Sequence, residues 1–184
     1  MLTLNFNPFP ILSTKRLVLR QISVDDVKEV FTLRSDTTIM QFINRPLAKT
    51  TPDALQLIQK IIDCTAAVEG ITWAISLQNN TTLIGTIGFW MIDKENHRAE
   101  IGYLLHPDHQ QKGIMQEAIE AVLAYGFTTM QLHSVEANVN PANEASKKLL
   151  DKNKFIQEGY FRENYFFEGQ FLDSAIYSLI TPLK

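Results

Sequence analysis

Hydrophobic and polar positions follow two different periods along this chain, and the period separates expected helices from expected strands. Where apolar residues recur three or four positions apart, as at Leu55, Ile58 and Ile61, they form one face of a helix. A Ser, Thr or Pro at the first turn strengthens the prediction. On these grounds we expect four helices: one that follows Ser23, one that begins at Thr51-Pro52, and two that span residues 111–129 and 141–152.

Runs of apolar and β-branched residues between polar turns predict strands. They span residues 17–22, 71–77, 82–92, 98–105, 133–139, 155–167 and 171–180. Polar turns join the second, third and fourth of these runs into an antiparallel meander, and residues 36–50 are expected to form a loop. The strand–helix–strand order from residue 98 to residue 139 predicts one parallel pair with a right-handed crossover. The fold class is therefore α/β, with a mixed, mostly antiparallel sheet and helices on both of its faces.

The composition is that of one soluble globular domain, which we expect to span residues 1–184. Hydrophobic residues make up 45% and charged residues 20% of the chain, which excludes disorder. The net charge of −3 and the lack of a basic stripe in the sequence argue against nucleic acid as a partner, and no apolar run is long enough to span a membrane. The one cysteine, Cys64, cannot form an intrachain disulfide and is interpreted as a small buried hydrophobe, so we expect a cytoplasmic protein.

A short polar loop after the strand that ends at Leu105 carries the clearest chemical signal. It runs from Gln110 to Met115 and contains Lys112 and Gly113. A helix N-terminus presents unpaired N–H groups and a partial positive charge, the glycine lets the backbone approach a ligand, and the lysine adds a full charge. The loop therefore predicts an anion site suited to a pyrophosphate, although an ordinary strand-to-helix turn would show the same pattern.

A metal site is an alternative use of this region, because His106, Asp108 and His109 precede the loop. A protein metal site usually needs four ligands, and residues placed this closely around Pro107 offer poor geometry for them. No further cluster of His or Cys lies nearby in the sequence. We therefore expect no metal.

Three motifs, spread in order over nearly the whole chain, resemble those of one family. The loop Gln110-x-x-Gly113-x-Met115 is similar to Q/R-x-x-G-x-G/A, with methionine in place of the last small residue. The segment Asn140-Pro141-x-Asn143-x-x-Ser146, followed by Phe155 and Glu158-Gly159, resembles N-x-x-N-x-x-S…G-F…E-G, with Lys154 where a glycine is expected. The opening Thr14-Lys15-Arg16-Leu17-x-Leu19-Arg20 resembles T-x-R-L-x-L-R. The chain thus resembles the GNAT superfamily of N-acetyltransferases, in particular its branch of ribosomal-protein alanine N-acetyltransferases.

The resemblance implies a GNAT-like fold in which the parallel strands splay apart and acetyl-CoA, the implied co-substrate, lies in the gap. The loop backbone would hold the pyrophosphate, and the strand end would pair with the pantetheine arm. Two polar side chains near the start of the last helix would contact the arm and the thioester. The implied cofactor-binding residues are Leu104, Leu105, Gln110, Gln111, Lys112, Gly113, Ile114, Met115, Asn143 and Ser146.

Direct attack of an amine on the thioester needs a base for the amine and a proton for the leaving thiolate. Glu100, on the strand that leads to the loop, is the candidate base, either directly or through a water molecule. Ser146 is the candidate proton donor to sulfur, and His133 and Glu136 are weaker alternatives for the base. Ordinary structural roles stay open, since Glu100 could be a surface carboxylate and Ser146 could bond its own backbone.

The expected function is transfer of an acetyl group from acetyl-CoA to a primary amine, with the N-terminal α-amine of a protein, such as a ribosomal protein, as the favoured acceptor. One alternative is acetylation of a polyamine, amino sugar or antibiotic, for which Glu95, Glu163 and Glu168 could hold the cation. Another is a non-catalytic acyl-CoA-binding module. Residues 36–50 and the 161–172 hairpin are expected to shape the acceptor pocket. The oligomeric state stays open, a homodimer included.

Overall fold

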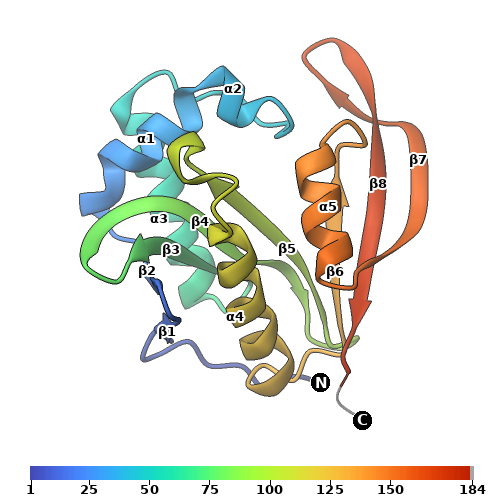
Figure 1. The fold of residues 1–184 in the computed structure, drawn as a ribbon, viewed down its shortest axis with the longest axis horizontal. Helices are drawn as coiled ribbons and strands as arrows, with labels where there is room; N and C mark the ends of the chain where they lie inside the picture. The colour runs from blue at the N-terminus through green and yellow to red at the C-terminus, as the bar shows by residue number, and fades with distance from the viewer. Residues whose placement is uncertain (183–184) are drawn as a thin grey trace.

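The protein folds around one mixed sheet of eight strands in the order β1-β2-β3-β4-β5-β6-β8-β7 (Figure 1). This computed structural model describes residues 1–182, so residues 183–184 of the predicted domain lie outside the described part of the chain. The strands are β1 (Leu12–Ser13), β2 (Leu17–Gln21), β3 (Ile71–Leu77), β4 (Asn80–Asp93), β5 (Arg98–Leu105), β6 (Ser134–Val139), β7 (Ile156–Phe167) and β8 (Gln170–Ile180). The helices are α1 (Val27–Ser35), α2 (Thr37–Met40), α3 (Thr51–Ala66), α4 (Ile114–Thr128) and α5 (Glu144–Lys152), with short 3-10 turns η1 (Val24–Asp26) and η2 (Pro107–His109).

The predicted parallel pair is confirmed, and it is short. Neighbouring strands are antiparallel except β5 and β6, which are connected through α4. The parallel pairing joins only Arg98–Glu100 to Ser134–Glu136. Past Glu100, β5 stays paired with β4 as far as Leu105, whereas β6 is paired there with β8 alone. The two halves of the sheet therefore splay apart and leave an open edge on β5 (Figure 1).

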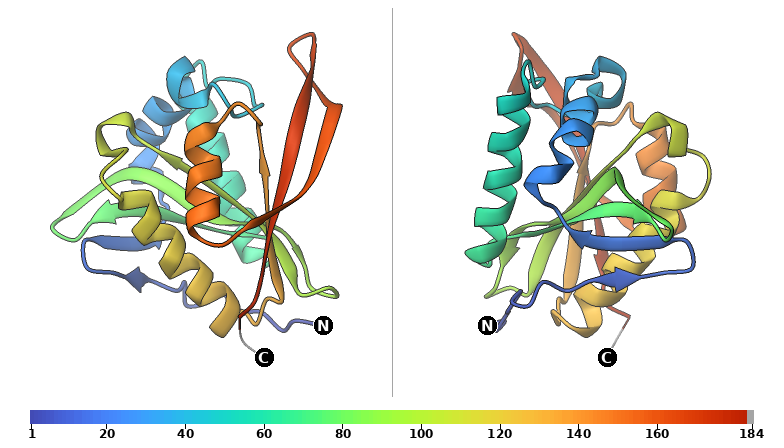
Figure 2. Two further views of the ribbon diagram at one scale, coloured as in Figure 1. Left: turned by 45° about the vertical axis from the view of Figure 1, so that its right-hand side comes forward. Right: turned by 90° about the vertical axis from the view of Figure 1, so that its left-hand side faces the viewer.

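Helices cover both faces of the sheet, with α1 and α3 on one side and α4 and α5 on the other (Figure 2). Successive side chains of β5 point to the two faces in turn. Ile101 and Leu105 are buried in the core cluster that includes α4, whereas Leu104 packs with the cluster around α1 and α3. By this alternation Glu100 lies on the α1–α3 side of the sheet and Tyr103 on the α4–α5 side.

The helix predicted over residues 111–129 begins later than expected. Gln111 and Gly113 have positive φ angles of 57° and 72°, which are incompatible with a right-handed helix. As a result α4 starts at Ile114, with Gly113 as its N-cap residue. Residues 110–113 form a separate loop that leads into the helix, and this loop matters for the site.

Two other predictions differ from the structure. The helix expected from Pro141 begins at Glu144, because the side chain of Asn143 accepts a hydrogen bond from a backbone N–H of the first turn. The proline therefore lies in the preceding turn and not in the first turn of the helix. Within the expected loop over residues 36–50, Thr37–Met40 form the one-turn helix α2.

Candidate active site

The loop before α4 presents a run of unpaired backbone N–H groups. Within the described chain, no oxygen accepts a hydrogen bond from the backbone N–H groups of residues 111–116. Successive N–H groups in such a turn form a concave anion site, and the start of α4 adds the positive end of its dipole. Lys112 is exposed beside them, while Ile114 is buried and anchors the helix. A Cβ atom added at Gly113 would meet only Arg16, at 3.4 Å, so the loop surface is open to a ligand. These features fit a diphosphate group.

Arg16 fixes the other side of this loop. Its guanidinium donates hydrogen bonds to the carbonyl oxygens of Lys112 and Gly113, at 2.9 and 3.1 Å, and to the carboxylate of Glu117 at 2.6 Å. Glu117 also accepts from the Arg16 backbone N–H at 2.8 Å and from the Thr14 hydroxyl at 2.6 Å. Because the two carbonyls are held toward Arg16, the loop N–H groups are left to face a ligand. The sequence motif contains Arg16, but it did not indicate this role.

Leu104 and Leu105 end β5 beside the gap in the sheet, the first half-buried and the second buried. The carbonyl oxygen of Leu105 accepts a hydrogen bond from the Gln110 side chain at 3.0 Å, which ties the anion-binding loop to the strand end. Past Glu100 the edge of β5 that faces the gap has no strand partner among the described residues. An unpaired strand edge can bind an extended ligand through main-chain hydrogen bonds.

Asn143 and Ser146 lie at the start of α5, across the gap from β5. The side-chain oxygen of Asn143 accepts the Ser146 N–H at 3.0 Å, so its amide NH2 group is left as a donor. The hydroxyl of Ser146 lies 2.7 Å from the hydroxyl of Tyr103 on β5. Burial raises the pKa of Tyr103 to about 12, and the hydrogen bond to Ser146 opposes that rise only in part. Tyr103 is therefore a neutral hydroxyl donor at physiological pH.

Glu100 stands where β5 and β6 separate, on the α1–α3 side of the sheet. Its carboxylate makes no hydrogen bond or ion pair with any described residue. Burial raises its pKa, the neighbouring carboxylate of Glu136 raises it further, and Arg45 opposes both effects. A half-buried carboxylate with a raised pKa and free lone pairs is suited to accept a proton.

The two weaker candidates for the base are placed less favourably. Glu136 lies opposite Glu100 in the parallel pair, but its carboxylate is ion-paired with Arg98 at 3.1 Å. His133 is exposed before the start of β6, and its backbone N–H donates to the carbonyl of His97. The geometry therefore favours Glu100 over either of them.

The segment after α2 reaches the C-terminal hairpin on the same side as Glu100. Arg45 donates a hydrogen bond to the hydroxyl of Tyr165, and that hydroxyl donates to the carbonyl of Asn44, both at 3.1 Å. Tyr165 belongs to β7, so the 36–50 segment and the hairpin meet near Glu100. The loop before α4 and Ser146 lie on the α4–α5 side of the sheet, and Glu100 lies on the α1–α3 side.

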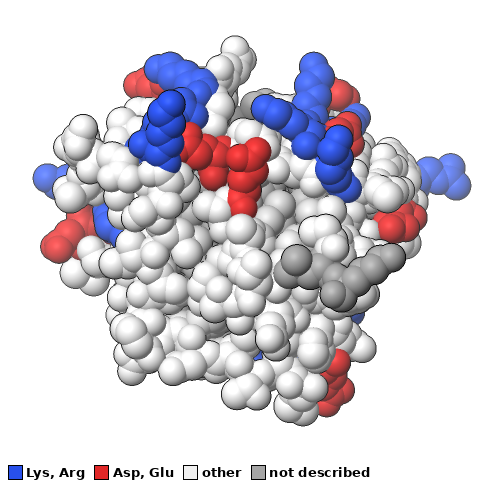
Figure 3. Space-filling view, turned by 60° about the horizontal axis from the view of Figure 1, so that its bottom comes forward, with Lys and Arg blue, Asp and Glu red and all other residues white. Residues whose placement is uncertain are grey.

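Three features of residues 1–182 bear on membrane, metal and nucleic-acid binding. No helix in this range is long and apolar enough to cross a membrane. No group of three or more His, Cys, Asp or Glu side chains in this range is placed to hold a metal ion. On the face shown in Figure 3, acidic side chains lie between two groups of basic ones, so the basic residues there do not form a continuous stripe. Cys64 is half-buried, whereas the sequence predicted a small buried hydrophobe.

Comparisons with known proteins agree with this geometry. Residues 16–156 match the family described as the acetyltransferase (GNAT) domain. The chain is 36% identical over 174 residues to the uncharacterized N-acetyltransferase YoaA of Bacillus subtilis, which covers 95% of this chain and 98% of that protein. It is 33% identical over 101 residues to the ribosomal protein uS5 alanine N-acetyltransferase of Escherichia coli, covering 54% of this chain and 52% of that one.

A solved structure shares the fold. The ribosomal L7/L12 α-N-protein acetyltransferase RimL in complex with coenzyme A has a TM-score of 0.86, with 21% identity over 95% of this chain and 100% of that chain. The chain therefore belongs to the GNAT acetyltransferase family, as an N-acetyltransferase that uses acetyl-CoA as its co-substrate.

Proposed function

We propose that this enzyme acetylates the N-terminal α-amine of a protein, with a ribosomal protein as one candidate, by direct attack of the amine on the thioester. The observation that carries the proposal is Glu100, a carboxylate with a raised pKa and no partner among the described residues. It lies at the point where the sheet splays, on the face from which an acceptor can enter. The relative from Escherichia coli supports an alanine α-amine as the acceptor class.

The free energy of deprotonation also favours an α-amine. An α-amine has an unperturbed pKa of about 7.7–8.0, and a lysine side chain one of about 10.4. At pH 7 neutralising the amine costs about 1.2 kcal/mol for the first and about 4.6 kcal/mol for the second. Glu100 is the single carboxylate proposed as the base. A single base of this kind suits an α-amine, which costs less free energy to neutralise than a lysine side chain.

The remaining roles follow from where each group lies. The N–H groups of residues 111–115 bind the pyrophosphate, and Arg16 holds the carbonyls of Lys112 and Gly113 away from it. The open edge of β5 at Leu104 and Leu105 pairs with the pantetheine arm, which Asn143 contacts through its free NH2 group. A backbone N–H near Leu105 stabilises the oxyanion. Glu100 takes the proton of the amine, and Ser146 supplies one to the sulfur.

A polyamine acceptor is less well supported by the charges near the site. The acidic residues that could hold a polycation are dispersed, since Glu95 lies in the turn between β4 and β5, whereas Glu163 and Glu168 belong to the β7–β8 hairpin. That turn and the tip of the hairpin lie at opposite ends of the molecule (Figure 2). Glu100 interacts with both the carboxylate of Glu136 and the guanidinium of Arg45, and Glu136 is itself ion-paired with Arg98. The positive charge of Arg45 would repel a polycation.

The test is a competition between amines. Peptides with a free N-terminal Ala or Ser and one internal Lys are incubated with enzyme and acetyl-CoA, and the modified amine is located by mass spectrometry. We expect acetylation at the α-amine in preference to the lysine. Spermidine and an amino sugar are assayed in parallel by release of free coenzyme A. Acetylation mainly at lysine, or turnover with spermidine alone, would refute the proposal, and binding of acetyl-CoA without any turnover would indicate a non-catalytic module.

A further inference from the structure

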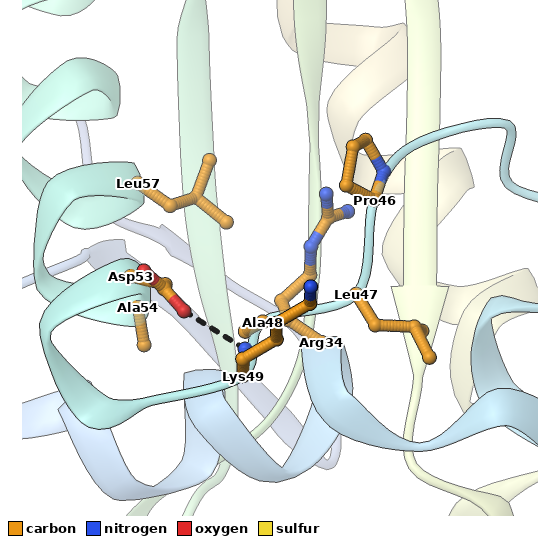
Figure 4. A pocket seen from close by; sticks show the side chains of 8 residues that line it. All are labelled: Arg34, Pro46, Leu47, Ala48, Lys49, Asp53, Ala54 and Leu57. Atoms are coloured by element: carbon orange, nitrogen blue, oxygen red, sulfur yellow. Dashed lines mark hydrogen bonds between the residues drawn. The ribbon is translucent and has the colours of Figure 1, made fainter.

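Arg34 extends into a cavity on the α1–α3 side of the molecule. The cavity has a volume of about 320 Å³ and lies between the last turn of α1, the segment 46–49 and the first turns of α3. Figure 4 shows the guanidinium of Arg34 reaching toward Pro46, with Leu57 facing it from α3. The apolar stem of the side chain thus lies along the cavity wall, and its charged end is directed into the space.

The described part of the chain supplies no anion for this guanidinium. Among residues 1–182, Arg34 has no side-chain hydrogen bond and no ion pair. The carboxylate that lines the cavity is Asp53, and its Oδ2 accepts the backbone N–H groups of Lys49 and Thr50 at 2.8 and 2.9 Å. Lys49 adds another positive charge to the lining. A partly buried cation usually has a counter-charge, so an unpaired one indicates a place for an anionic ligand group.

Arg45 connects this cavity to the candidate base. Arg45 directly precedes Pro46, which lines the cavity. In agreement with that position, burial and the charge of Arg45 lower the pKa of Arg34. Arg45 is also near enough to Glu100 to oppose the rise of its pKa. Its own hydrogen bond goes to the hydroxyl of Tyr165, and it forms no ion pair with a described carboxylate. Two arginines that form no ion pair with a described residue therefore lie between the cavity and the place where the amine would lose its proton.

We propose that Arg34 and Arg45 bind a carboxylate or phosphate group of the acceptor, so that the preferred acceptors carry an anionic group close to the reacting amine. The inference rests on the proposed function, because it takes Glu100 as the place where the amine reacts. A guanidinium presents a planar fork of donors that matches a carboxylate or phosphate in two hydrogen bonds. In a peptide acceptor the group would be an Asp or Glu side chain that follows the N-terminal residue. In a small acceptor it would be the carboxylate of an amino acid.

The experiment compares three peptides that differ only at the second position, Ala-Asp-, Ala-Asn- and Ala-Lys-, by kcat/KM for α-amine acetylation. Hydrogen bonds to charged groups are stronger than those between neutral groups, so we expect Ala-Asp- to be preferred over Ala-Asn- by about tenfold or more. Arg34→Gln and Arg45→Gln should each reduce that ratio to about threefold or less, whereas the Kd for acetyl-CoA stays unchanged. Lys28→Gln is the matched control, since it removes one positive charge from the exposed face of the same helix as Arg34 and should keep the wild-type ratio.

Each outcome decides between this inference and the proposed function. Equal kcat/KM for the three peptides, or a preference for Ala-Lys-, would overturn the inference and leave α-amine acetylation intact. A wild-type preference for Ala-Asp- that persists in both arginine variants would also overturn it. A further arm uses free aspartate and β-alanine: rapid turnover of these without any peptide acetylation supports an anionic acceptor and refutes the protein N-terminus as the substrate.

Discussion

The hydroxyl groups of Tyr103 and Ser146 lie 2.7 Å apart and connect β5 to α5 across the gap in the sheet. Because burial raises the pKa of Tyr103 to about 12, the phenol keeps its proton and can donate it to the Ser146 oxygen. A serine hydroxyl that accepts one hydrogen bond keeps its own proton free to donate. In the proposed reaction Ser146 donates to the thioester sulfur, and Tyr103 orients it.

The first prediction concerns this pair. Ser146→Ala should lower kcat by about tenfold to 10²-fold, because the leaving thiolate loses its proton donor, with little change in the Kd for acetyl-CoA. Tyr103→Phe should give a smaller loss, and the double variant should be no slower than Ser146→Ala alone, because the two groups act as one unit. Steady-state kinetics of the four proteins is the measurement. Additive losses in the double variant would show that the two hydroxyls act independently.

Glu100→Gln should reduce kcat by about 10²-fold or more at neutral pH while acetyl-CoA still binds normally. The same substitution should leave the melting temperature equal or raise it. The pKa of Glu100 is raised in the folded state, so the group destabilises the fold as the pH rises through its unfolded-state pKa, and the effect is complete above the folded-state pKa. A neutral glutamine removes this effect. Glu95→Gln, at an exposed turn, is the control for loss of one carboxylate. Wild-type turnover in Glu100→Gln would remove it as the base.

Two substitutions near Glu100 should shift the pH profile of kcat/KM in opposite directions. If Glu100 is the base, kcat/KM falls at low pH as this carboxylate becomes protonated. Glu136 raises the pKa of Glu100, so Glu136→Gln should move the acid limb to lower pH. Arg45 lowers that pKa, so Arg45→Gln should move the limb to higher pH. Profiles that shift in the same direction, or not at all, would show that the limb reports another group.

The sequence predicted the parts of this molecule that depend on neighbours along the chain. The alternation of apolar residues placed most strands to within a few positions, and the strand–helix–strand order gave the parallel pair. The two helix starts that were wrong depend on single-residue geometry. The left-handed backbone at Gly113 and the N-cap at Asn143 make each helix begin about three residues later than the sequence predicted.

The contacts that the sequence did not reveal join residues far apart in the chain. Tyr103 and Ser146 are 43 positions apart, Arg16 and Glu117 are 101 apart, and Arg45 and Tyr165 are 120 apart. No local period encodes such pairs, because they form only when the sheet brings distant segments together. Even so, the match of Arg16 to a family motif could have marked it as a functional residue, because it is a polar residue at a fixed position directly before a strand.

A fourth prediction concerns the loop that Arg16 holds in place. Arg16→Gln should weaken acetyl-CoA binding by about tenfold, or about 1.4 kcal/mol, because the carbonyls of Lys112 and Gly113 lose the donors that hold them away from the ligand. Lys15→Gln is the matched control, since Lys15 is exposed next to Arg16 and should bind the cofactor as the wild type does. Calorimetric titration with acetyl-CoA measures the effect directly.

Gly113 tests the same loop from the ligand side. At a φ of 72° a side chain costs about 1–2 kcal/mol of backbone strain, so Gly113→Ala should lower stability as well as affinity. Gly113→Glu adds a carboxylate beside the pyrophosphate and should weaken binding by at least another tenfold or so at equal strain. A bound ligand raises the melting temperature by mass action, so the upward shift with saturating acetyl-CoA should shrink in the order wild type, Gly113→Ala, Gly113→Glu. If folded Gly113→Glu bound acetyl-CoA as tightly as the wild type, the pyrophosphate would have to lie elsewhere, and the role given to Arg16 would be lost with it.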